Sequence, residues 1–202
     1  MINKIRFLHI FRVWLLYGMV ITIVLSRLNL NSLCIILFTL AWLIEGNLKN
    51  KWALLVKDKL FIAYALYFLI QLEGLAQAEN IYNGWDSVEN KLGFLMLPMV
   101  FCSGPFLNIA TRRKVMLVFT LAITVAAIYC LAIAGIRYLH TGNSEFFFYH
   151  QLVSPISHHA VYFSVYTFIA VVFLISEDRS LPWLAGNRFV YISWIIFLLL
   201  LL

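Results

Sequence analysis

Long apolar runs recur along the whole chain, and they constrain the possible fold more than any other feature. Apolar residues make up 63% of the 202 residues, whereas charged residues make up only 12%. A soluble domain is about half apolar and about a quarter charged, so this chain has too few polar residues to cover a water-soluble core. The sequence therefore predicts an all-α fold, a polytopic transmembrane helical bundle with lipid around most of its surface.

About seven of these runs approach the roughly 20 residues that a helix needs to cross about 30 Å of hydrocarbon. A tight turn at Arg27–Asn29 joins the first two as a helical hairpin. In the fourth, Pro98, Gly104 and Pro105 are expected to kink the helix or to make it partly re-entrant. We predict one transmembrane domain over residues 1–202. Its spans are Val13–Leu28, Leu30–Ile44, Leu60–Ala76, Leu92–Ile109, Val115–Ile136, His159–Ser176 and Phe189–Leu202.

The distribution of basic residues predicts the orientation. A net charge of +6 is compatible with nucleic-acid binding, but the basic residues lie in short clusters between apolar runs and form no basic stripe. With a cytoplasmic N-terminus, all of the 15 lysines and arginines except Arg27, Lys91 and Arg137 fall on the cytoplasmic side. This is the bias of the positive-inside rule. The sequence predicts a multi-pass protein with a cytoplasmic N-terminus, a lipid environment and no nucleic-acid partner.

The two ends of the chain carry different signals. No small-x-small cleavage site follows the first apolar run, so we read it as a signal anchor and not as a cleaved signal peptide. The last run, Phe189–Leu202, provides about 21 Å of helix, which is short of a ~30 Å hydrocarbon core. It ends in consecutive leucines without a polar flank. We therefore expect the chain to be the first part of a longer protein.

Polar side chains suited to chemistry gather in two predicted outer loops, residues 77–91 and 137–158. The first contains three carboxylates, and the second contains an arginine, several histidines and the aromatic run Phe146–Tyr149. Interfacial aromatic residues that set the depth in the bilayer are the simpler explanation of the aromatic side chains. Glu73 lies in the outer turns of the third span, where a carboxylate must face protein or water. This favours an interior role, with Arg137 as a candidate partner, over plain exposure.

Two interpretations stay open for the strongest candidates. Arg137 either extends its charge to the lipid headgroups or holds a diphosphate, because a guanidinium suits paired phosphate oxygens. His159, Tyr162, Phe163 and Tyr166 share one face of the sixth span at helical spacing. This face either lines a cavity or forms hydrogen bonds between helices.

The sequence gives no sign of a metal or another cofactor. The neighbouring His158 and His159 diverge by about 100° on a helix, so they are poorly placed to share one ion. The three cysteines, Cys34, Cys102 and Cys130, lie in apolar runs without metal-ligand spacing.

Two stretches of this sequence are recognisable. The first runs from Glu79-Asn80 through Trp85–Leu92 to Leu97–Phe101, and the second combines Gly142–Tyr149 with His159–Ser164. Together they resemble motifs of the O-antigen ligase family, in which an acidic and basic segment enters the fourth span and an aromatic run precedes a His-Pro-x-Tyr-Phe-Ser pattern. Gly93 stands where that family often has serine, and Ala160 stands where it often has proline.

This resemblance implies a bacterial inner-membrane glycosyltransferase that works without metal. It would transfer a glycan from an undecaprenyl-diphosphate carrier on the periplasmic side. The acceptor would be lipid A–core, a growing polymer or a protein. The family's principal catalytic residues lie mostly beyond the region covered here, so no catalytic residue is assigned and this stretch alone is expected to be inactive. The candidate substrate-binding residues are Glu73, Glu89, Lys91, Arg137, His159 and Tyr162.

Two other function classes remain. A transporter or flippase component would be expected to show an inverted repeat of broken spans, and only the fourth span is broken. A non-catalytic membrane scaffold is also compatible with the absence of a catalytic motif.

Overall fold

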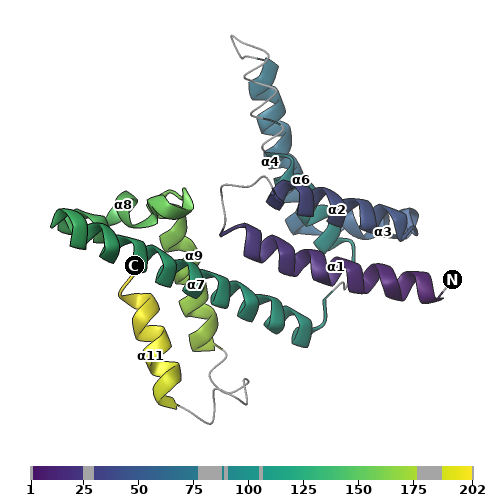
Figure 1. Cartoon of the computed structure of the whole chain (residues 1–202). Coiled ribbons are helices and arrows are strands. Elements are labelled where there is room, and N and C mark those ends of the chain that lie inside the picture. The colour runs from purple at the N-terminus through teal and green to yellow at the C-terminus, as the bar shows by residue number, and fades with distance from the viewer. Residues whose placement is uncertain are drawn as a thin grey trace. The chain divides into compact units, whose positions relative to one another are not determined.

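The computed structural model describes residues 2–24, 30–76, 88, 91–104, 107–176 and 188–201. Every regular element in this part of the chain is a helix, so the predicted all-α class is confirmed (Figure 1). The chain divides into two compact units. Unit 1 comprises Met1–Leu16 and Leu30–Ile109, and unit 2 comprises Tyr17–Asn29 and Ala110–Leu202.

Unit 1 is built from short helices that pack around α6. Its elements are the first part of α1 (Ile2–Thr22), α2 (Leu30–Ile44), α3 (Leu48–Leu55), α4 (Lys59–Ala76) and α6 (Gly93–Cys102). Helix α6 packs against α2, α3 and α4. Ring contacts join Phe38 to Phe101 at 5.7 Å between centroids and Tyr67 to Phe94 at 5.8 Å. These aromatic pairs connect α6 to α2 and α4.

A sharp corner separates α2 from α3. The axes of the two helices differ by 116°. Gly46 and Asn47 at the corner have positive φ values of 79° and 58°. Glycine and asparagine are the residues that tolerate this left-handed conformation best, so the local sequence suits the turn. Leu55, which is fully buried, anchors the far end of α3 in unit 1.

The predicted fourth span is a much shorter helix than expected. Helix α6 has only 10 residues, about 15 Å of rise, and it continues through Pro98. It ends at Cys102, two residues before Gly104, whose φ of 145° no helix contains. Helix α6 therefore ends just before Gly104 and is not broken at Pro98. Pro105 lies outside the described residues.

Unit 2 is organised by one long helix. Helix α7 (Ile109–Thr141) has 33 residues and is followed by η1 (Ser144–Phe147), α8 (Tyr149–Val153), η2 (Ser154–Ile156), α9 (Ala160–Ser176) and α11 (Arg188–Leu199). The last turns of α1 also belong to this unit. Its core consists of small and branched side chains of α7 that pack with residues of α9 and α11. Among them are Ile123, Ala127, Cys130, Phe163, Ala170, Leu174 and Leu198.

Helix α7 is longer than its predicted span, Val115–Ile136, at both ends. Arg112, Arg113 and Lys114 were expected in a loop but lie in the first turns of the helix. At the other end, Arg137 and His140 are also helical. The outer loop expected over residues 137–158 is therefore mostly helix, because α7, η1, α8 and η2 occupy most of it.

The membrane-spanning character is supported in a limited form. Within the described residues, α7 is the one helix long and apolar enough to cross a membrane by itself. Two bent pairs meet the same test if each is counted as one span: α2 with α3, and Tyr149–Ile156 with α9. The larger number of spans stays a prediction. The hairpin turn Arg27–Asn29 and most of the loop 77–91 lie outside the described residues.

Candidate functional site

The candidates of the first predicted outer loop are only partly described. Glu89 lies outside the described residues. Glu73 is an exposed residue of α4. The Lys91 ammonium donates a hydrogen bond of 2.5 Å to the Gln71 Oε1 of α4. Glu73 and Arg137 belong to different units, so their pairing stays a prediction.

Arg137 is held by the short elements that follow α7. Its Nη1 donates a hydrogen bond of 2.9 Å to the Ser154 Oγ of η2, and its Cζ lies 5.7 Å from the centroid of the Phe146 ring. The Ser154 hydroxyl in turn donates to the Gln151 carbonyl oxygen at 2.9 Å. Among the described residues, the ion pairs are confined to unit 1, so no carboxylate there neutralises Arg137. These contacts hold the guanidinium in position, and the bond to Ser154 uses only one of its five N–H donors.

His159 and Tyr162 are brought together, and a third side chain joins them. The His159 ring lies 5.8 Å from the Tyr162 ring and 4.3 Å from the His150 ring, both between centroids. The His150 Nδ1 also accepts a hydrogen bond of 3.4 Å from the backbone N–H of Ala160, the first residue of α9. His150 was predicted only as part of the outer loop. The structure places it directly beside the predicted pair.

The side chains of the predicted His/Tyr stripe of the sixth span differ in burial. Phe163 is only 2% exposed and belongs to the core, whereas Tyr162 is 61% exposed. Tyr166 contacts the rings of Phe119 and His158. The exposed His159 and Tyr162 thus form a surface pair, and Phe163 and Tyr166 pack inward.

The described residues contain no group of three or more His, Cys, Asp or Glu side chains that could hold a metal ion. His158 and His159 have different partners. The His158 Nε2 lies 3.0 Å from the carbonyl oxygen of Ile23, whereas His159 contacts His150.

Unit 2 also contains an apolar groove with a volume of about 790 Å³. Helix α7 forms most of its wall, and η2 contributes Pro155 and Ile156. These two residues directly follow Ser154, the partner of Arg137. The remaining lining residues are Ile21, Val24, Val118, Leu121, Ala122, Val125, Ala126 and Tyr129.

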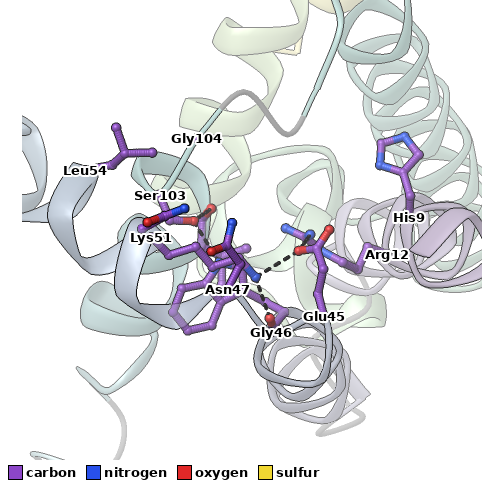
Figure 2. Close-up of a pocket in the computed structure, with 12 residues that line it drawn as sticks. His9, Arg12, Glu45, Gly46, Asn47, Lys51, Leu54, Ser103 and Gly104 are labelled. Carbon is purple, nitrogen blue, oxygen red and sulfur yellow. Dashed lines mark hydrogen bonds and ion pairs between the residues drawn. The ribbon is translucent and has the colours of Figure 1, made fainter. Parts of the chain in front are cut away.

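Unit 1 contains a polar pocket that the sequence analysis missed (Figure 2). Arg12, Glu45 and Lys51 point toward one another in it. The Glu45 Oε2 accepts from the Arg12 Nη1 at 2.7 Å and from the Lys51 Nζ at 2.9 Å. Arg12 is only 3% exposed. From the sequence, the two basic residues were expected only to set the orientation of the chain. The one sequence feature that indicated a polar pocket was Glu45, an acidic residue at the end of the second apolar run and between two basic clusters.

Further bonds fix this pocket to the α2–α3 corner. The Lys51 ammonium donates to the Trp42 carbonyl oxygen at 2.7 Å and lies 4.8 Å from the Trp42 ring centroid. The Trp42 indole N–H donates to the Ser103 Oγ at 2.7 Å, and Ser103 donates to the Val100 carbonyl oxygen at 2.9 Å. The pocket therefore joins α1, α2, α3 and the end of α6.

Comparison of the chain with protein-family models, with curated proteins and with solved structures finds no match.

Proposed function

We propose that this chain forms the polyprenyl-carrier-binding region of an O-antigen ligase-like protein in the bacterial inner membrane. In this proposal it crosses the membrane about seven times, with a cytoplasmic N-terminus. It receives an undecaprenyl-diphosphate-linked glycan at the periplasmic face, for transfer to lipid A–core or another acceptor. The apolar composition, the charge bias between loops and the two motif-like stretches support this proposal.

The observation that carries the proposal is the position of Arg137 relative to the apolar groove. A single turn, η2, supplies both Ser154, which holds the guanidinium, and Pro155 and Ile156, which line the groove. A polyprenyl diphosphate has the same two parts, an apolar chain joined to a strongly charged group. Its chain would occupy the groove, and its diphosphate would lie against Arg137.

Charge and volume are consistent with this ligand class. The groove volume of about 790 Å³ is within the range of sites for small molecules and cofactors, so the groove would hold only the isoprene units nearest the diphosphate. A charge-assisted contact between a guanidinium and a phosphate contributes about 1.5–3 kcal/mol. The exposed His150, His159 and Tyr162 lie in the segments that follow Arg137 and would contact the first sugar of the glycan.

The test is direct binding of undecaprenyl diphosphate to the purified chain, with undecaprenol as the matched lipid that lacks the charge. We expect the diphosphate to bind at least about tenfold more tightly, equivalent to about 1.4 kcal/mol. Ala122→Trp, which fills the groove, should weaken both lipids. The control is Ile128→Trp on an exposed part of α7 outside the groove. Equal affinity for the two lipids, or equal loss in both variants, would contradict the proposal.

A further inference from the structure

The polar pocket of unit 1 has the features of a binding site for an anion. It has a volume of about 360 Å³ and is lined by charged and amide side chains at the α2–α3 corner. This volume is near the lower end of the range for small-ligand sites, so it suits a headgroup and not a whole lipid. The polar lining residues are His9, Arg12, Glu45, Asn47, Asn50, Lys51 and Ser103.

The charges of the lining leave a positive excess. Two cations, Arg12 and Lys51, share the single carboxylate of Glu45, so the three side chains together carry one net positive charge. Lys51 uses two of its three ammonium hydrogens for Glu45 and the Trp42 carbonyl. Its remaining donor and the amides of Asn47 and Asn50 can contact an oxyanion. A phosphate offers several acceptor oxygens to such a set of donors.

The corner also has the features of a helix at a membrane surface. Helix α3 turns away from the apolar helix α2 by 116°. Leu48, Trp52 and Leu54 of α3 are exposed, and exposed Lys49 and Lys57 accompany them. Tryptophan at headgroup level and lysine near anionic lipids are typical of interfacial helices.

We propose that the Arg12–Glu45–Lys51 pocket binds the phosphate of an anionic phospholipid headgroup. The assignment of this lipid to the cytoplasmic leaflet rests on the proposed orientation of the chain. The binding itself does not depend on that orientation, nor on the polyprenyl site of unit 2.

The experiment titrates the purified chain in detergent with phosphatidylglycerol or phosphatidylcholine and counts bound lipids by native mass spectrometry. We expect phosphatidylglycerol to bind about tenfold more tightly, because the pocket carries a net positive charge. Inorganic phosphate should compete only weakly. Equal binding of the two lipids would overturn the proposal. Full displacement by equimolar inorganic phosphate would show that the site takes free phosphate and not a headgroup.

Two variants of the lining locate the site, one within the ion-pair network and one outside it. Lys51→Gln should weaken phosphatidylglycerol binding but also removes bonds that hold the corner. Asn50→Asp is the more specific test, because Asn50 is exposed and the substitution adds one negative charge to the lining. We expect a loss of about fivefold to tenfold. Asn143→Asp in unit 2 has the same charge change and should bind normally.

Arg137→Ala separates this proposal from the polyprenyl site. It should leave phosphatidylglycerol binding intact while undecaprenyl diphosphate binding falls. Loss of phosphatidylglycerol binding in Arg137→Ala but not in Asn50→Asp would place the lipid in unit 2 and overturn the inference.

Discussion

Arg12 in unit 1 and Arg137 in unit 2 differ in burial and in ion pairing. In unit 1, Arg12 is nearly fully buried, and its charge is met by Glu45, which Lys51 also contacts. In unit 2, Arg137 is partly exposed and is held by a hydroxyl group and an aromatic ring, with no carboxylate partner among the described residues. The Arg12–Glu45 ion pair stabilises the unit, because either partner alone would be left uncompensated. Only the excess charge that Lys51 adds is left to attract an anion there. A positioned but unneutralised arginine is available to a ligand.

The largest expected effect is on the stability of unit 1. Glu45→Gln should lower the free energy of unfolding by about 3 kcal/mol, because it removes the carboxylate charge that pairs with the buried Arg12. Glu73→Gln is the matched control, since Glu73 is exposed, and its effect should stay within about 0.5 kcal/mol. Unfolding in detergent, followed by circular dichroism, measures both. Similar small losses in the two variants would show that the Glu45 interaction does not stabilise the unit.

The next effect concerns ligand binding by unit 2. Arg137→Ala should reduce the affinity for undecaprenyl diphosphate by about 10- to 100-fold, at about 1.4 kcal/mol per decade. Arg137→Lys should also bind less well, because lysine keeps the charge but loses the planar fork. Arg112→Ala on an exposed turn of α7 should bind normally. If Arg137→Lys bound undecaprenyl diphosphate as tightly as the unchanged chain, Arg137 would be a residue that extends its charge to the lipid headgroups.

A smaller effect compares one substitution in the two units. Gly46→Ala should destabilise by about 1 kcal/mol, because Gly46 has a φ of 79° and alanine is strained there. Gly135→Ala, in the interior of α7, should stabilise by about 0.5–1 kcal/mol, because glycine is a poor helix former. A new Cβ meets nothing within 4 Å at either position. Thermal unfolding should therefore give opposite signs, and equal signs would contradict the assigned backbone geometry.

Some elements could be predicted from the sequence because local features define them. The second predicted span and α2 both cover Leu30–Ile44, since an apolar run ends there at Glu45-Gly46-Asn47. The sixth predicted span differs from α9 by one residue. By contrast, α7 extends beyond its apolar segment into Arg112 and Arg137. Hydropathy indicates which residues suit lipid, and it does not indicate where a helix ends.

The sites were harder to predict because they depend on distant parts of the chain. Arg12 and Glu45 are 33 positions apart, and their pairing needs the packing of α1 on the α2–α3 corner. His150 reaches His159 because the chain bends by 82° between Tyr149–Ile156 and α9, with Ser157 in a left-handed conformation at the bend. No local pattern encodes either contact. The proximity of His159 and Tyr162 could be predicted, because side chains three positions apart lie on one face of a helix.

In the proposed orientation, residue 50 lies on the cytoplasmic side of the membrane and residue 143 lies on the periplasmic side. Single cysteines at Asn50, beside the unit 1 pocket, and at Asn143, beside the η1 turn of unit 2, test it in a chain whose native cysteines are replaced by alanine. In intact spheroplasts, a membrane-impermeant thiol reagent should label the cysteine at position 143 and leave the one at position 50 unlabelled until the membrane is opened. Labelling at position 50 but not at position 143 in intact spheroplasts would contradict the account.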